Sequence, residues 1–171
     1  MPETPQQYTA RMLALAGSRD PLRTLSATPG QLARMLARQP AAALRRAAGP
    51  GKWSVRQIVA HLADTEVVHA YRIRMMLGDS GGTIQAFDQD VWAAEGRYED
   101  VDIKVALDAF TALRRLNLAF YKRLTPAKRR RYGVHQERGR ESIDHTSRMY
   151  TGHDLNHMGQ IAALLGKSAI Q

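Results

Sequence analysis

One long stretch, residues 54–77, most constrains how this chain can fold. Ser54 and Gln57 form a capping-box pattern, and Gly78 follows the stretch, so the sequence predicts a helix between them. At 100° per residue, an apolar stripe separates from a neighbouring, mostly polar stripe. The second stripe consists of Gln57, His61, Asp64, Thr65, Val68 and Arg72. Such a stripe is typical of a helix that meets another helix around a polar cavity.

The remaining segments show helical periodicity, and none shows the alternation of a β-strand. We expect helices over 5–16, from Asp20-Pro21, restarting at Thr28-Pro29, over 41–48 after a break at Pro40, over 102–124 and over 142–166. Residues 79–101 should contain one short helix, over 88–95 with Trp92 on its inner side, and residues 126–141 should form a basic connection. The fold class is therefore all-α. The connection after residue 78 is long enough for a crossover rather than a tight hairpin.

Composition limits the classes of protein to which the chain can belong. With 171 residues it is long enough for one domain with a sizeable core, and we expect a single domain over 1–171 with 1–19 as an N-terminal extension. No apolar run is long enough for a membrane span, and the first residues lack a secretory pattern. The absence of cysteine excludes a disulfide framework and a thiol nucleophile. These features favour a cytoplasmic protein.

The net charge of +9 raises the question of nucleic-acid binding. However, the basic residues are spread along the chain, and the one dense run, residues 128–131, has no interleaved aromatic residue apart from the adjacent Tyr132. No DNA- or RNA-binding signature is present. We therefore expect a small-molecule partner rather than a nucleic acid.

Two histidines in the last predicted helix indicate a metal site. His153 and His157 lie four residues apart, so their Cβ atoms should be roughly 5–6 Å apart on one helix face. Their neighbours on that face are apolar, and a buried imidazole needs partners for its ring nitrogens. His61 is the natural third ligand, because it also borders an inward face. Three imidazoles with an open position suit zinc, nickel or another divalent transition ion.

Other polar residues have weaker assignments. We expect His69, His135 and His145 to be structural, although a loop residue such as His135 could reach an open cavity. Asp154 should orient one of the metal-ligating histidines without contacting the ion itself. Asp64, one turn after His61, could orient that histidine or accept a proton, and the alternative is that Asp64 and Arg72 are an ordinary surface acid and base.

Three segments resemble the DinB/YfiT-like superfamily: residues 51–66, containing Trp53-Ser54 and His61-Leu62, residues 71–74, and residues 152–161. The resemblance implies a four-helix bundle that binds a divalent metal through one histidine of the second bundle helix and two of the fourth. These correspond to His61, His153 and His157. Short extra helices would precede the bundle, and the crossover would join its second and third helices.

The resemblance also implies activities. Relatives include S-transferases that use a low-molecular-weight thiol, such as bacillithiol or mycothiol, and thiol-dependent isomerases. The sequence thus favours a metal-dependent, S-transferase-like enzyme on a small molecule, with metal-assisted hydrolysis as a variant. Arg72, and also Arg74, would bind an anionic group. The alternative is a non-catalytic metal-binding protein of a stress response, and a homodimer stays open in either case.

Overall fold

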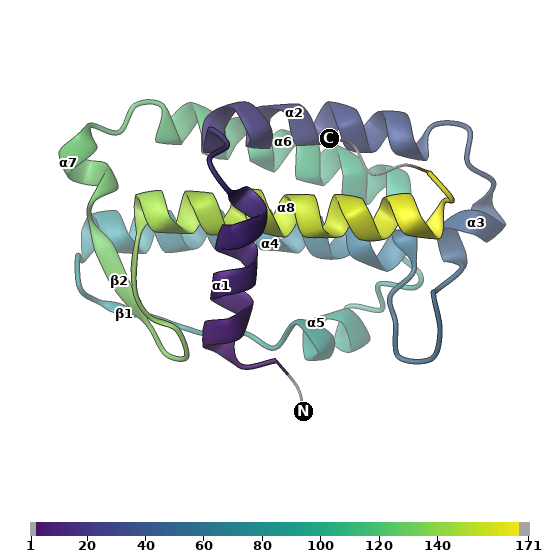
Figure 1. Cartoon of the computed structure of the whole chain (residues 1–171), viewed down its shortest axis with the longest axis horizontal. Helices are drawn as coiled ribbons and strands as arrows, with labels where there is room; N and C mark the ends of the chain where they lie inside the picture. The colour runs from purple at the N-terminus through teal and green to yellow at the C-terminus, as the bar shows by residue number, and fades with distance from the viewer. Residues whose placement is uncertain (1–2, 168–171) are drawn as a thin grey trace.

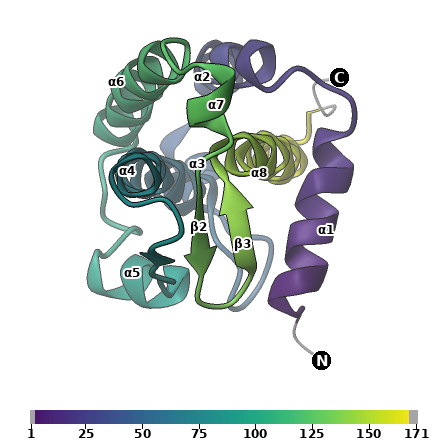
Figure 2. The ribbon, with the colours of Figure 1, turned by 90° about the vertical axis from the view of Figure 1, so that its left-hand side faces the viewer.

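The computed structural model describes residues 3–167, and a four-helix bundle forms its centre. The bundle helices are α2 (Pro21–Leu36), α4 (Val55–Gly78), α6 (Ile103–Tyr121) and α8 (Ile143–Leu164). Seen nearly end-on in Figure 2, they occupy the four corners of the bundle. The predicted bundle is confirmed, and the predicted Ser54–Gln57 capping box is present at the start of α4.

Four shorter helices surround the bundle: α1 (Pro5–Ala16), α3 (Ala41–Arg45), α5 (Gln89–Glu95) and α7 (Pro126–Arg129). α1 crosses the outer side of α8 at a steep angle (Figure 1). α3 ends at Arg45, earlier than expected. α5 begins at the predicted cap, Asp88, but Trp92 is 38% exposed, so its predicted inward position is wrong. Within the described range 3–167, no helix is long and apolar enough to cross a membrane.

The order of the helices explains the long crossover. α4 and α6 pack against each other and run in the same direction along the bundle (Figure 1). The chain leaving α4 must therefore return along the whole bundle before α6 can begin, which a tight hairpin cannot do. Residues 79–102, with α5 among them, make this return.

A small sheet at one end of the bundle corrects the expectation that the chain has no strand. β1 (Thr83–Ile84) pairs in parallel with β2 (Tyr132–His135), and β2 pairs antiparallel with β3 (Gly139–Ser142). These strands are short and carry few apolar residues, so periodicity could not reveal them. The β2–β3 hairpin lies on the side of the bundle where α4 faces α8 (Figure 2).

α2 continues through Pro29, so the predicted restart at Thr28 is wrong. Proline has no N–H to donate to the carbonyl four residues earlier, which here belongs to Leu25. The guanidinium of Arg114 supplies the missing donor, since its Nη1 lies 3.0 Å from the Leu25 carbonyl oxygen. A side chain from α6 thereby compensates for the break in the hydrogen-bond ladder of α2.

Arg114 is also the centre of a buried ionic network. It donates to Glu66 of α4 at 2.8 Å and to both carboxylate oxygens of Asp154 of α8 at 2.6 and 3.0 Å. Asn117 of α6 donates to the second oxygen of Glu66 at 3.0 Å. The three charged side chains are at most 3% exposed, and the network contacts all four bundle helices.

The apolar core packs around this network. Its largest fully buried side chains come from all four bundle helices and include Leu32, Leu62, Phe110 and Ile161. The Arg114 guanidinium lies 4.7 Å from the centre of the Phe110 ring, which adds a cation–π contact.

Replacing Arg114 by leucine should lower the free energy of unfolding by about 3–5 kcal/mol, because it leaves the two buried carboxylates of Glu66 and Asp154 without a counterion. Urea denaturation measures the loss. Lys104→Leu is the matched control on the same helix, since the Lys104–Asp108 pair is exposed and should contribute no more than about 0.5 kcal/mol. Equal effects of the two substitutions would contradict a structural role for the network.

Gly152 lets α1 approach α8 closely. A Cβ atom at this position would lie 1.8 Å from the backbone oxygen of Met12, so only glycine fits. Gly152→Ala should therefore displace α1 and lower the free energy of unfolding by about 2–3 kcal/mol. Gly159, on the same helix, has open space around it, and Gly159→Ala should be neutral or stabilising by up to about 1 kcal/mol. Thermal denaturation of both variants tests this contrast.

Candidate metal centre

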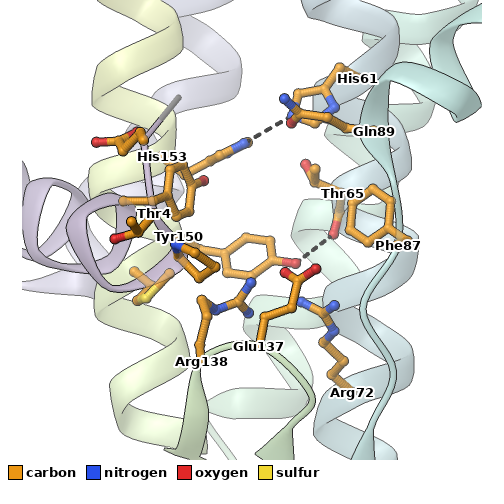
Figure 3. A pocket seen from close by; sticks show the side chains of 14 residues that line it. Thr4, His61, Thr65, Arg72, Phe87, Gln89, Glu137, Arg138, Tyr150 and His153 are labelled. Atoms are coloured by element: carbon orange, nitrogen blue, oxygen red, sulfur yellow. Dashed lines mark hydrogen bonds between the residues drawn. The ribbon is translucent and has the colours of Figure 1, made fainter. Parts of the chain in front are cut away.

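Three histidines meet between α4 and α8. His61 projects from α4, and His153 and His157 project from successive turns of α8. The His153 Nε2 atom lies 3.0 Å from the His61 Nε2 and 3.1 Å from the His157 Nε2, and the ligand atoms of the group all lie within 4.8 Å of one another. All three side chains are buried. Figure 3 shows His61 and His153 pointing toward each other from opposite helices.

Hydrogen bonds among the imidazoles cannot satisfy this arrangement. A ring nitrogen offers either one proton or one lone pair along one direction in the ring plane. His153 Nε2 can therefore bond to His61 or to His157, but not to both. A divalent ion accepts several lone pairs at once, and nitrogens about 2.0–2.1 Å from a tetrahedral ion lie roughly 3.3 Å apart. The two short distances are close to this value, so the donor set fits such an ion.

Burial keeps the three imidazoles neutral, as metal binding requires. Desolvation lowers the pKa of His61 to about 3 and that of His157 to about 4. The pKa of His153 lies well below its usual range, because desolvation acts together with repulsion from the other two histidines. The lone pairs are thus free over the whole physiological pH range.

Neighbouring side chains orient two of the rings. The Nδ1–H of His157 donates to Gln160 Oε1 at 2.7 Å, which leaves the lone pair on Nε2. The ring of Trp53 lies 4.8 Å from that of His61 and limits its rotation. The Nδ1 atoms of His61 and His153 are buried without a partner in the described part of the chain.

The histidines lie where two cavities meet. His61 and His153 line a cavity of about 340 Å³, and His157 lines a second one of about 790 Å³. Glu3, Tyr8 and Gln89 line both. The sizes suit a small-molecule ligand, and the shared walls indicate one divided cleft with the histidines at the division.

A model of the DinB superfamily matches residues 24–161, a span that includes all three histidines. The chain belongs to the DinB superfamily. This finding confirms the resemblance seen in the sequence, and the three-histidine cluster is a feature of this member of the family.

Two relatives illustrate what this superfamily member is similar to. A protein of Oceanobacillus iheyensis is 28% identical over 114 residues, which are 67% of this chain and 66% of the relative. One from Bacillus licheniformis is 30% identical over 116 residues, 66% of this chain and 65% of the relative. Both bear the name "putative metal-dependent hydrolase". The match thus spans about two thirds of the length of these relatives.

A solved structure supports the fold of this superfamily member. YfiT from Bacillus subtilis matches with a TM-score of 0.80 at 22% identity, over 86% of this chain and 87% of that one. It is described as a probable metal-dependent hydrolase with an unusual four-helix bundle topology. At this identity the likeness shows the fold alone.

The two acidic residues singled out in the sequence do not contact the histidines. Asp154 pairs with Arg114, so it does not orient a ligand as predicted. Asp64 accepts a hydrogen bond from the hydroxyl group of Tyr98 and is not among the residues that line either cavity. The structure therefore brings the three histidines together without either carboxylate.

Arg72 and Tyr150, in contrast, line the smaller cavity. His135 lies beneath Arg72, whose Nη2 donates to its Nε2 at 3.2 Å, and does not line either cavity. His69 stacks on Tyr150 with ring centres 4.0 Å apart, and His145 lies half-buried in the first turn of α8. These three histidines lie outside the cluster.

Several residues of the cleft were missed in the sequence. Tyr8 belongs to the segment interpreted as an N-terminal extension, and Gln89 lies in the crossover. Their contribution depends on long-range docking, for which no local pattern exists. Gln160 could have been found, because it follows His157 by three residues and therefore lies on the same helix face.

His69 should make the stability of the metal-free protein depend on pH. Desolvation, with Arg114 and Arg72 nearby, lowers its pKa to about 3, although Asp154 acts in the opposite direction. The unfolded chain takes up a proton near pH 6.5 and the folded chain does not, so stability falls as the pH drops below 6.5.

His69→Phe keeps an aromatic ring against Tyr150 and removes the titration. When the pH is lowered from 7 to 5, the free energy of unfolding should fall by about 2 kcal/mol less in His69→Phe than in the wild type. Urea titrations after chelation measure this difference. Parallel pH profiles of the two proteins would show that His69 already takes up its proton in the folded state.

Proposed function

We propose that this protein is a metal-dependent enzyme, most simply a hydrolase, that acts on a small molecule in the divided cleft. One observation carries the proposal: three buried, neutral imidazoles converge where two ligand-sized cavities meet. The names of the curated relatives support hydrolysis as the reaction class.

His61, His153 and His157 would hold the ion, and zinc or nickel suits three imidazole ligands. When bound, such an ion supplies Lewis-acid chemistry, polarising a carbonyl or phosphoryl oxygen and lowering the pKa of water toward ~7. Gln160 keeps the His157 lone pair on Nε2, and Trp53 holds the His61 ring in place. The residues thus form a preorganised site before any ion binds.

The two cavities match the needs of a cleavage reaction. A substrate whose scissile bond lies at the histidines would place one fragment in the smaller cavity and the other in the larger one. The larger cavity has apolar walls, such as Trp53 and Ile58, beside the cationic Arg11 and Lys52, so it can hold a fragment with both apolar and anionic parts. α1, through Tyr8, covers both cavities and limits the access of bulk water.

Thiol transfer is the second candidate and uses the same ligands. Because the chain has no cysteine, the thiol would have to enter as a small-molecule substrate, and the larger cavity has room for one. A non-catalytic metal-binding role predicts metal without turnover of any substrate.

Metal analysis tests the shared basis of these proposals. Untagged wild-type protein, reconstituted with zinc or nickel, should contain close to one ion per chain by plasma mass spectrometry. His61→Ala, His153→Ala and His157→Ala should each lose most of it while their helical circular dichroism persists. His145→Ala is the matched control, since it removes a histidine of α8 outside the cluster, and it should keep its metal.

Equal metal content in all five proteins, or none in the wild type, would contradict the proposal. With metal bound, turnover of esters, amides or phosphoesters without added thiol favours the hydrolase. Turnover that requires a thiol favours the transferase. No turnover of any substrate in a broad screen favours the non-catalytic metal-binding role.

A further inference from the structure

Arg72 is a buried cation without an acidic partner. It is 5% exposed, and its Nη2 donates to the Gln85 backbone oxygen at 2.9 Å and to His135 Nε2 at 3.2 Å. Both acceptors are neutral. The first is a backbone carbonyl, and the second is an imidazole, because desolvation together with Arg138 and Arg72 lowers the pKa of His135 to about 4. Within residues 3–167, no carboxylate oxygen lies within ion-pairing distance of Arg72.

Buried Arg114 and half-buried Arg138 show what Arg72 lacks. Arg114 binds Glu66 and Asp154, and Arg138 binds both oxygens of Glu141 at 2.6 and 3.1 Å. Burying a guanidinium without a compensating charge is costly. An arginine that is buried beside a cavity and has no counterion therefore indicates that the anion comes from outside the chain.

The position of Arg72 relates it to the candidate metal centre. It follows His61 by eleven residues, which is close to three helical turns, so both side chains lie on one face of α4, about 16 Å apart at their Cα atoms. Because helical side chains point toward the N-terminus, Arg72 extends toward His61. In Figure 3 His61 and His153 lie at one end of the cavity and Arg72 and Arg138 at the other.

The other groups in this cavity do not supply the missing charge. Burial raises the pKa values of Tyr8 and Tyr150, so both phenols stay neutral. Glu3 accepts two hydrogen bonds from Arg11, one from Nε and one from Nη2, each 2.8 Å long. Glu137 lines the cavity but is exposed and lies beyond ion-pairing distance of Arg72.

We infer that Arg72 binds the anionic group, a carboxylate or a phosphate, of the small molecule whose reacting bond lies at the three histidines. A guanidinium offers two parallel donors, which match the paired oxygens of either group. As a substrate subsite this assignment rests on the proposed function, whereas anion binding itself can be measured without metal.

Calorimetric titration of the full, metal-free chain tests the inference. The probes are inorganic phosphate and succinate, each at constant ionic strength maintained with chloride. The wild type should bind at least one of them saturably, with one site per chain. Arg72→Met should weaken binding roughly tenfold or more, because a charged hydrogen-bond donor is lost. The structure corrects the expectation that Arg74 also binds the anion, because Arg74 is exposed on α4 and lines neither cavity. Arg74→Met is therefore the matched control and should bind like the wild type.

Two further variants sharpen the outcome. Glu137→Gln removes the carboxylate that lines the cavity without an ion pair in the described chain, and it should tighten binding. Arg72→Lys keeps the charge and the fold but cannot form two parallel bonds, so it should bind more weakly than the wild type. No saturable binding by the wild type, or wild-type affinity in Arg72→Met or Arg72→Lys, would overturn the inference.

The result is independent of the metal experiment. Anion binding that depends on Arg72, in a protein that takes up no metal, would preserve the subsite and refute the metalloenzyme. Metal uptake without anion binding would preserve the metalloenzyme proposal and refute the anion subsite. Comparison of phosphate with succinate shows which kind of anion the subsite prefers.

Discussion

The interaction between Arg114 and its three hydrogen-bonded partners determines how the bundle helices are placed. The guanidinium of α6 binds a carboxylate from α4, another from α8 and a backbone carbonyl of α2 that Pro29 leaves free. Each contact requires a particular axial position of the helix concerned, because a shift by one residue would carry the group to another face. The buried network can therefore specify one register among several that an apolar core would tolerate.

The candidate metal centre depends on that register. Asp154 directly follows His153, and Glu66 lies little more than a turn after His61, so the contacts of Arg114 fix the α4 and α8 segments that carry the three histidines. Gly152, on the other side of His153, fixes α1 against the same segment of α8. Three successive residues therefore have different roles. Gly152 lets α1 pack over the cleft, His153 is a candidate metal ligand, and Asp154 binds Arg114.

Much of this architecture could be predicted, because its signals are local. Helical spacing brought His153 and His157 together, and the capping box placed His61 on α4. Contacts between distant elements left no such signal: the pairing of β1 with β2, the docking of Tyr8 and the pairing of Arg114 with Leu25. Asp154 was misassigned for the same reason, since spacing shows the direction of a side chain but not the partner from another helix. Arg114 itself lies in a stretch dominated by apolar residues, and no local pattern indicates that it is the centre of an ionic network.

The buried polar groups divide into two kinds, and the division separates stability from function. Arg114 and the carboxylates of Glu66 and Asp154 have complementary charges and bond directly to each other, so they hold the bundle together. The histidines and Arg72 share the same low-dielectric interior, but within the described chain the Nδ1 atoms of His61 and His153 have no hydrogen-bond partner and Arg72 has no acidic partner. Low dielectric strengthens any interaction they make with an incoming ligand. The burial that makes this region costly for the free protein is therefore what would let a metal ion and an anion bind there tightly.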